Sequence, residues 1–437
     1  MHFSKFVLIA LLLLLFRAAW AAADTYTVIN TETGGAGSLY RAILDANARI
    51  GLDTITFNIP GTGVHTIRPY GALPALTDPV RINGTTQPGY AGTPLIQING
   101  IQAGNTSGFT IAVSGCTIRA LAINRFDQHG IHIQADADGN TITGNFIGTD
   151  TTGTTALPND GSGIYIVNSA TNTIGGATVN ERNIIAGNQQ AGILITGSQA
   201  TGNTLLGNYI GVNAAGAAAL GNGWDGILID GAPNNSIGQA SAEGRNIISG
   251  NAQAGVRITG IQASGNTLLG NYIGLNSVGA AALGNSWDGI LIDGAPNNTI
   301  GGASAEGRNI ISGNSYSGVT ITNNGATGNM LQANFIGLNA AGTAAVGNQG
   351  SGVSIYTARG NYVGGTVAGA TNVISGNGEC GVLISGLGSD SNSIQRSIIG
   401  LSNAGTVAVP NATFGIRISD GSYNVIGGFW CSCRRCR

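Results

Sequence analysis

The chain has 437 residues, of which 73 are glycine, about 17% against roughly 7% in ordinary proteins. Charged residues make up 9% of the chain, against roughly 25% in ordinary proteins, and the formal net charge is -2. A disordered chain combines low hydrophobicity with high charge, whereas 42% of this chain is hydrophobic. The glycines follow no three-residue period, which excludes a collagen. The charge balance provides no basic surface for nucleic acid, so nucleic acid is not an expected partner.

The N-terminus has the pattern of a secretory signal peptide. An apolar run over residues 6–16 is followed by Ala21 and Ala23, which fit an A-x-A cleavage motif. The run is shorter than the ~20 apolar residues that span a bilayer; a short membrane anchor is the alternative interpretation. We expect residues 1–23 to be a signal peptide and the mature chain to have no membrane span. The chain is then secreted, and extracellular or held at the cell surface.

Residues 24–108 lack the repeat described below and are predicted to form an N-terminal cap with irregular first coils. A strand is expected in the segment TYTVIN, followed by one short helix. Ser38 is a suitable N-cap, and we expect the helix to continue to about Arg49 and to be closed by Gly51. The residues expected on its buried side are Leu39, Ile43 and Ala46.

The rest of the chain repeats with a period of 63 residues. The segment GNTITGNFIG at Gly139 has an equivalent at each further step of 63, the last of them at Ser391. A shorter motif, G-[IV]-x-I, occurs twice in each period, at steps that alternate between 29 and 34 residues after a first step of 33. Each period is therefore two structural coils. The motif begins at Gly130, Gly163, Gly192, Gly226, Gly255, Gly289, Gly318, Gly352, Gly381 and Gly415.

These motifs predict that the coils stack on one another. Each coil contains three strands that are too short to bury their apolar side chains against neighbours in sequence, so only an adjacent coil can cover them. In GILIDG, Ile227 and Ile229 point to one side and Leu228 and Asp230 to the other. Parallel crossovers are nearly always right-handed. We therefore predict an all-β, right-handed parallel β-helix solenoid with about ten regular coils over residues 109–428.

Two expectations concern columns of equivalent residues in the stack. Ile227, Ile258 and Ile290 are predicted to share one interior column. Asparagines that recur at fixed corners are expected to bond to one another and to the backbone, and so to have a structural role. One series follows the tetrads: Asn140, Asn172, Asn203, Asn235, Asn266, Asn298, Asn329, Asn361, Asn392 and Asn424. A second series precedes the third strand: Asn145, Asn183, Asn208, Asn246, Asn271, Asn309, Asn334 and Asn372.

The chain resembles a known group of proteins. The stretches GSLYRAILDAN, DTITFNIPG and INGTTQPGY are similar to the N-terminal segment of bacterial secreted right-handed parallel β-helix repeat proteins, some of which carry a segment named CSLREA. The resemblance covers residues 24–428. It departs from the CSLREA pattern at Tyr40 and lacks a cysteine before Ser38. It implies export and an extracellular or surface role, and it implies no catalytic residues.

Residues 429–437 form an atypical tail, FWCSCRRCR, where the repeat predicts another strand. Three interpretations are open. A metal site needs a fourth ligand and a fold to hold it, and a disulfide is compatible with an oxidising compartment. We favour the third, that a truncation or a change of reading frame interrupts the repeat. The tail residues in question are Cys431, Cys433 and Cys436, with Arg434, Arg435 and Arg437.

The best candidate for a ligand site is the segment WDGILIDG, which occurs twice, over residues 224–231 and 287–294. An indole beside carboxylates suits the face of a sugar and its hydroxyl groups. A duplicated solvent-exposed turn is the simpler interpretation, and paired carboxylates for hydrolysis are a third one. The candidate ligand-binding residues are Trp224, Asp225, Asp230, Trp287, Asp288 and Asp293.

Three other groups of polar residues have simpler interpretations. His129 and His132, with Asp127, are the second place to seek acid–base chemistry, although isolated surface histidines explain them. The remaining two groups are a D-x-D-x-N pattern that resembles part of a calcium loop and a recurring arginine that predicts an exposed charge ladder. The first contains Asp136, Asp138 and Asn140, and the second contains Arg182, Arg245 and Arg308.

Taken together, these patterns predict a secreted or cell-surface β-helix protein with a structural, adhesive or glycan-contacting role. We assign no catalytic residue, no metal site and no cofactor, and the expected partner is a polysaccharide or cell-surface glycan. The alternative is a polysaccharide lyase or glycoside hydrolase that acts along an outer groove of the β-helix.

Overall fold

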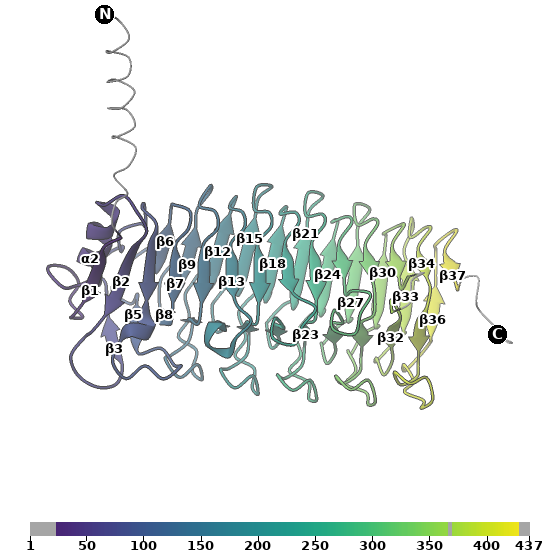
Figure 1. Cartoon of the computed structure of the whole chain (residues 1–437). Coiled ribbons are helices and arrows are strands. Elements are labelled where there is room, and N and C mark those ends of the chain that lie inside the picture. Colours follow the sequence, from purple (N-terminus) through teal and green to yellow (C-terminus); the bar gives the residue numbers. More distant parts are fainter. Residues whose placement is uncertain (1–22, 366–368, 428–437) are drawn as a thin grey trace, which may run out of the picture.

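The computed structural model describes residues 23–365 and 369–427. In these residues the chain forms a right-handed parallel β-helix, a rod in which successive coils lie side by side along one axis (Figure 1). Three sheets of 14, 12 and 11 strands run along the rod. The predicted fold class is confirmed. The tail predicted for residues 429–437, and all but the last residue of the predicted signal peptide, lie outside the described residues.

Each coil contributes one strand to each sheet. The 14-stranded sheet contains β1 (Thr25–Val28), β2 (Asp53–Phe57), β4 (Val80–Asn83), β7 (Thr117–Arg119), β10 (Thr141–Thr143), β13 (Thr173–Gly175), β16 (Thr204–Leu206), β19 (Ser236–Gly238), β22 (Thr267–Leu269), β25 (Thr299–Ile300), β28 (Met330–Leu331), β31 (Tyr362–Val363), β34 (Ser393–Ile394) and β37 (Val425–Ile426). The 12-stranded sheet contains β3 (His65–Ile67), β5 (Ile96–Asn99), β8 (Leu121–Asn124), β11 (Phe146–Ile147), β14 (Ile184–Ile185), β17 (Tyr209–Ile210), β20 (Ile247–Ile248), β23 (Tyr272–Ile273), β26 (Ile310–Ile311), β29 (Phe335–Ile336), β32 (Asn372–Ile374) and β35 (Ser397–Ile399). The 11-stranded sheet contains β6 (Phe109–Ile111), β9 (Ile131–Ile133), β12 (Ile164–Val167), β15 (Ile193–Thr196), β18 (Ile227–Asp230), β21 (Val256–Thr259), β24 (Ile290–Asp293), β27 (Val319–Thr322), β30 (Val353–Tyr356), β33 (Val382–Ser385) and β36 (Ile416–Ile418).

The interior of the rod follows the alternation that the tetrads predict. Ile227 and Ile229 of β18 are fully buried, whereas Leu228 and Asp230 face outward. Equivalent residues of every coil join into one apolar cluster that continues along the rod. Because each strand is only two to five residues long, it buries its apolar side chains through the coils above and below rather than through its own neighbours in sequence.

The expected alignment of three interior isoleucines is wrong in register. Ile227 pairs with Val256, and Val256 pairs with Ile290, so these three residues form one column. Ile258 pairs with Ile229 in the neighbouring column. The reason is that the tetrad of β21 begins with valine, which takes the position that isoleucine has in the flanking coils. All of these side chains are buried, so the stack itself is as predicted.

Asparagine ladders line the corners of the coils, as predicted. Asn235 illustrates the pattern: its amide donates to Asn266 Oδ1 at 3.2 Å and to the backbone oxygen of Ala200 at 2.9 Å. The second predicted series forms a similar ladder, for example from Asn208 to Asn246 at 3.0 Å. These side chains are completely buried, and they satisfy polar backbone groups where the chain leaves one sheet and enters the next.

A third ladder lies at the remaining corner and was not predicted. Each amide donates to the side-chain oxygen of the next asparagine, and most of these contacts measure 2.9 Å. Its members precede the tetrads, at a distance that varies between three and four residues, which hides their regularity in the sequence. They are Asn159, Asn188, Asn222, Asn251, Asn285, Asn314, Asn348, Asn377 and Asn411.

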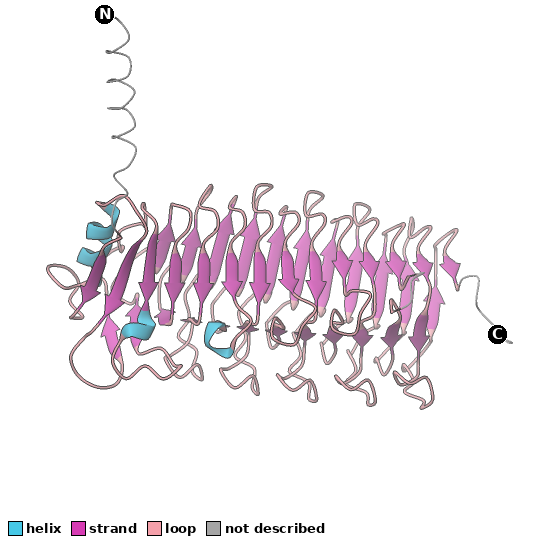
Figure 2. Ribbon diagram, in the orientation of Figure 1, coloured by secondary structure: helices cyan, strands magenta, loops and turns pink. Residues whose placement is uncertain are grey.

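Helix α2 (Leu39–Asn47) lies at the N-terminal end of the rod (Figure 2). The Ser38 side chain accepts a hydrogen bond from the Arg41 backbone N–H at 3.1 Å, as a helix N-cap should. Leu39, Ile43 and Ala46 are buried, as predicted, and the helix contacts β1 and β2. It ends two residues earlier than expected. The first strands, β1, β2 and β4, pair in series with the repeats in the 14-stranded sheet. Two short 3₁₀ helices, η1 (Gly84–Thr86) and η2 (Val179–Glu181), complete the helical elements of the described residues.

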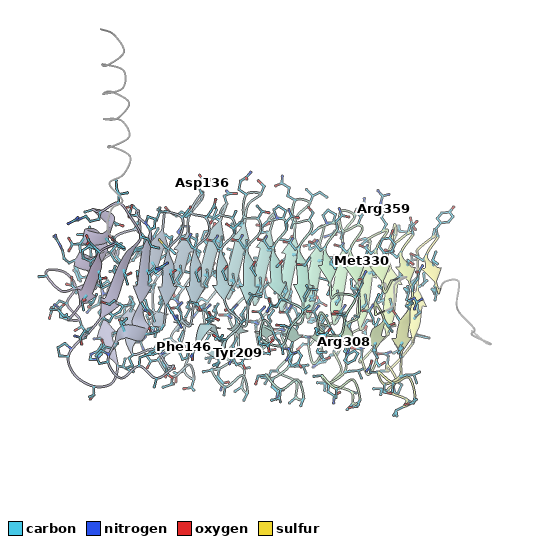
Figure 3. The ribbon with its side chains drawn as sticks, in the orientation of Figure 1. Asp136, Phe146, Tyr209, Arg308, Met330 and Arg359 are labelled. Carbon is cyan, nitrogen blue, oxygen red and sulfur yellow. The ribbon has the colours of Figure 1, made fainter. Side chains whose placement is uncertain are left out.

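Long loops that recur every second coil cover the outer face of the 12-stranded sheet. Phe146 and Tyr209 of this sheet point outward and pack beneath the loops with Val212 (Figure 3). The loops also bond to one another across two coils, for example through the Ala214 N–H and the Gly153 oxygen at 2.9 Å. This second layer seals one face of the rod. It leaves the outer face of the 11-stranded sheet, where the candidate site lies, free of such loops.

The recurring arginines pack into this layer, so the prediction of an exposed charge ladder is wrong. The guanidinium groups of Arg182 and Arg245 lie 4.0 and 4.1 Å from the centres of the Tyr209 and Tyr272 rings. Arg308 lies in the same way over a phenylalanine, and all three are half-buried. Each Nε donates to a backbone oxygen of the following coil, at 3.3, 3.1 and 2.8 Å. The arginines therefore stabilise the layer by cation–π contacts and hydrogen bonds.

Replacement of Asn251 by alanine should destabilise the rod, because its buried partners Asn222 and Asn285 lose their hydrogen bonds. We expect the free energy of unfolding to fall by about 1–3 kcal/mol for each polar group left unsatisfied. Denaturant unfolding followed by circular dichroism measures this loss. Gln262→Ala, at an exposed position of the next coil, is the matched control and should leave the midpoint unchanged. Equal midpoints for both variants would contradict a structural role of the third ladder.

Candidate functional site

The two WDGILIDG copies lie in line on the outer face of the 11-stranded sheet. Their strands, β18 and β24, are separated only by β21. Asp230 lies beside Thr259, which in turn lies beside Asp293. With a strand spacing of about 4.8 Å, equivalent atoms of the two copies are ~9.6 Å apart. The stacking therefore brings the two segments, 63 residues apart in sequence, onto one surface.

An exposed row of aromatic side chains follows one edge of this face. Trp224 and Trp287 occupy the same turn position two coils apart, with Gln253 between them, and Tyr316 follows on the next coil. Along the row, the backbone N–H of each residue donates to the oxygen of the residue on the preceding coil at 3.2 Å. The three aromatic side chains are 40%, 41% and 60% exposed. We call Trp224, Trp287 and Tyr316 the aromatic row.

The sequence analysis missed Tyr316, although a pattern in the sequence points to it. It stands two residues before the tetrad glycine Gly318, as Trp224 and Trp287 stand two residues before theirs. The segment GNSYSGV at this position parallels GNSWDGI one coil earlier. An alignment on the tetrads, instead of a search for identical copies, places all three aromatic residues in one column.

Asp225 and Asp288 lie at the base of the row rather than on the surface. Asp225 is buried, and its Oδ1 accepts a hydrogen bond from the Ala254 backbone N–H at 3.0 Å. Asp288 is half-buried and accepts from the Ser317 backbone N–H at 3.0 Å and from the Thr320 hydroxyl at 2.7 Å. Both carboxyl groups thus join consecutive coils together. Of the two, Asp288 retains the greater access to solvent.

Burial sets the protonation of these two carboxyl groups. Loss of hydration raises the pKa of Asp225 to about 6, against the lowering effects of the bond from Ala254 and of the nearby Arg257. The same cause raises the pKa of Asp288 above its ordinary value, while Thr320 and Ser317 lower it. The two copies are therefore identical in sequence and different in electrostatic environment.

Asp230 and Asp293 form the opposite edge of the face, together with Arg257 of the intervening strand. Arg257 Nη2 lies 3.1 Å from Asp293 Oδ2, in an ion pair of which both side chains are partly buried. Asn323 of the next coil donates a second hydrogen bond to Asp293. Asp230 is exposed. Arg257 is the one cationic residue on the outward positions of β18, β21 and β24, so the face as a whole is acidic.

A second polar cluster lies nearer the N-terminus on the same sheet. His129 and His132, the alternative acid–base residues, have ring centres 5.8 Å apart. Tyr165 joins them, with its ring 4.7 Å from His129 and stacked 5.0 Å from His132. The pairing of β9 with β12 places Tyr165 beside His132. Asp127, which was expected to accompany the histidines, is exposed. Tyr165 was missed because only the register identifies it as a neighbour.

Burial keeps both imidazoles uncharged. It lowers the pKa of His129 to about 4, with a further lowering by His132, although the hydrogen bond from the Ser162 backbone N–H to Nδ1 opposes this. Burial also lowers the pKa of His132, and it raises that of Tyr165. His132 Nε2 is buried without a hydrogen-bond partner among the described residues. The cluster therefore offers a neutral imidazole beside a protonated phenol at neutral pH.

The pattern that resembles part of a calcium loop is used by the fold. Asp138 Oδ1 accepts a hydrogen bond from the Ala170 backbone N–H at 2.7 Å, and Asn140 is buried in the first asparagine ladder. These residues therefore do not converge on a common point. Over residues 23–365 and 369–427, no group of three or more His, Cys, Asp or Glu side chains is arranged to hold a metal ion.

A shallow cavity of about 360 Å³ lies on a different face, over β28, β31 and β34 of the 14-stranded sheet. Its lining carries no charged side chain. Because it is formed by another sheet, it does not belong to the face that holds the aromatic row. The lining residues are Met330, Gln332, Tyr362, Gly364, Gly365, Ser393 and Gln395.

Comparison with known proteins identifies the fold. No protein-family model and no curated protein matches the chain. Among solved structures, the A-module of the mannuronan C-5 epimerase AlgE6 of Azotobacter vinelandii has a TM-score of 0.51 at 15% identity, over 92% of this chain and 98% of that one. The AlgE4 A-module from the same organism gives 0.44 at 16% identity, over 94% and 98%. The Dettilon tailspike protein gives 0.43 at 16% identity, over 89% and 66%.

At these identities the likeness shows the fold alone. The chain is a right-handed parallel β-helix repeat protein, as its repeats and sheets define it. The resemblance to the CSLREA-type segment remains a prediction. Among the described helices, none has the length and apolar character that a membrane crossing requires.

The raised pKa of Asp225 makes a testable prediction about stability. Its folded pKa, about 6, exceeds its ordinary value of 3.8, so ionisation opposes folding. The free energy of unfolding should therefore fall as pH rises from about 4 to about 6, by up to about 3 kcal/mol. Asp225→Asn retains an acceptor for the Ala254 N–H and removes the charge. We expect this variant to be more stable than the parent at pH 7, with a flatter profile over that range, measured by thermal unfolding. A variant that is less stable than the parent at pH 7 would contradict this account.

Proposed function

We propose that this chain is a secreted or cell-surface protein that contacts a glycan along the outer face of the 11-stranded sheet and does not act on it as an enzyme. The observation that carries the proposal is the aromatic row. Three adjacent exposed aromatic side chains at one turn position provide a continuous apolar edge of the kind that packs against sugar rings. Isolated exposed aromatics are ordinary, whereas a row along one edge of a rigid sheet is not expected without a partner.

The opposite edge of the face supplies hydrogen-bond acceptors for sugar hydroxyl groups. Asp230 is exposed, and Asp293 is held in place by Arg257 and Asn323. Both edges are attached to strands whose backbone hydrogen bonds continue through the stack. The positions of these side chains are therefore set before a ligand binds, which reduces the entropy lost on binding.

We also propose an assignment of the chain into segments. Residues 1–23 direct secretion, residues 24–108 form the N-terminal cap with the first coils, and residues 109–428 form the repeats. The position of α2 at one end of the rod supports the cap, because an uncovered end would expose strand edges and apolar side chains. The tail at residues 429–437 is kept apart from this assignment, as an interruption of the repeat.

The double variant Trp224→Ala, Trp287→Ala tests the proposed glycan contact. Loss of two stacking contacts should weaken binding to a glycan identified on an array by at least about ten-fold, or ~1.4 kcal/mol. Isothermal titration calorimetry with that glycan measures the change. Tyr70→Ala, at an aromatic residue that is 84% exposed in the N-terminal region, is the matched control and should bind as the parent does. Equal losses in both variants, or no loss in either, would refute the role of the row.

A second candidate function, a polysaccharide lyase, is favoured by the cluster of His129, His132 and Tyr165. In a lyase reaction a neutral imidazole takes the proton beside the uronate carboxyl group, and the electron pair forms a carbon–carbon double bond. The glycosidic C–O bond breaks, and a tyrosine hydroxyl donates its proton to the leaving oxygen. The uncharged state of both imidazoles and their ring contacts with Tyr165 suit these roles.

The lyase candidate is tested with polyuronates as substrates. If it is correct, the parent protein should generate unsaturated uronates, detected by their ultraviolet absorbance, and Tyr165→Phe should reduce the rate by about 10²–10⁴-fold. If the non-enzymatic proposal is correct, no such product forms with the parent, and neither Tyr165→Phe nor His132→Ala changes glycan binding at the aromatic row. Turnover that is lost in Tyr165→Phe would overturn the non-enzymatic proposal.

A further inference from the structure

We infer that the glycan bound along the aromatic row is a β-1,4-linked chain without carboxylate groups, of the cellulose or chitin type, that lies parallel to the rod axis. This inference rests on the proposed function and goes beyond it, because it names the linkage, the charge and the direction of the ligand. Two independent features of the face carry it, the spacing of the tryptophans and the sign of the charge.

The spacing selects the linkage. Trp224 and Trp287 are two coils apart at one turn position, which corresponds to ~9.6 Å. In an extended β-1,4-linked chain each sugar is turned over relative to the one before it, so the same ring face returns with every second sugar, at about the length of two strand spacings. A chain that lies along the rod would therefore present the same face to both indoles. Most α-linked chains curve away from a straight row at this distance.

The residue between the tryptophans fits the sugar between the stacked ones. Gln253 is half-buried, and its side chain offers an amide donor and an acceptor at the coil where the intervening sugar would lie. Tyr316 continues the row by one further coil and combines an aromatic face with a hydroxyl group. The alternation of aromatic and amide side chains thus parallels the alternation of sugar faces in the ligand.

The charge of the face excludes polyuronates. Asp225, Asp230, Asp288 and Asp293 lie on or beneath it, while Arg257 is the one cation on the outward positions of these strands and is already paired with Asp293. A polyuronate carries a carboxylate on every sugar and would place these groups within contact distance, where salt screens little because the Debye length is about 8–10 Å. Neutral hydroxyl groups, or the ammonium groups of an amino sugar, instead donate to the free carboxylate oxygens.

A transposition of one tryptophan tests the spacing at constant composition. The double variant Gln253→Trp, Trp287→Gln keeps two indoles and one amide but places the indoles one coil apart. We expect the parent to bind soluble cello- and chito-oligosaccharides, and the transposed variant to lose at least about ten-fold in affinity, as Trp287→Ala does. Titration calorimetry measures binding. Equal thermal unfolding midpoints for parent and variant show that a loss is not a folding defect.

The charge is tested separately with oligouronates of similar length. The parent should bind these at least about ten-fold more weakly than the neutral oligosaccharides, and Asp230→Asn with Asp293→Asn should narrow the difference. Transposed and parent proteins that bind cello-oligosaccharides equally, or a parent that prefers oligouronates, would overturn the inference. A glycan of another linkage that binds and is lost with Trp224→Ala would overturn this inference and leave the proposed function standing. A parent that binds no glycan would overturn both.

Discussion

Each coil of this rod exposes apolar side chains and unpaired backbone groups until the next coil covers both. The isoleucines of one coil contact those of its neighbours, and the asparagines at the three corners bond from coil to coil, so that the corners are satisfied without water. Neither interaction exists within a single coil. The stability of the fold, and the position of every outward side chain, therefore depend on contact between coils.

This dependence gives the outer face its character. A side chain at a given turn position returns at intervals set by the strand spacing, so a ligand meets residues of several coils as a regular row. The loops above the 12-stranded sheet cover the corresponding surface on another side of the rod, and their arginines lie over aromatic rings there. The 11-stranded sheet carries no such layer, and its aromatic and acidic side chains reach the surface.

Duplication copied the sequence WDGILIDG without copying its surroundings. Arg257 stands between the copies and pairs with Asp293, while Asp230 stays exposed. Asp288 receives a hydroxyl hydrogen bond from Thr320, whereas the equivalent position beside Asp225 is held by Arg257 of the following coil. Equivalent residues thus differ in charge and hydration, because their partners come from neighbouring coils that the repeat did not conserve.

The sequence by itself determined the architecture: the tetrads, their spacing and two of the asparagine series predicted the coils, because burial of isoleucine alternates with a period of two and must recur in each coil. Only the tertiary structure decided the lateral neighbours. It aligned Ile258 with Ile229, joined Tyr165 to the histidines, added Tyr316 to the two tryptophans and placed Arg182 over Tyr209. These relations depend on register between coils, and register is a property of how loops of unequal length bring strands together, which local sequence does not specify.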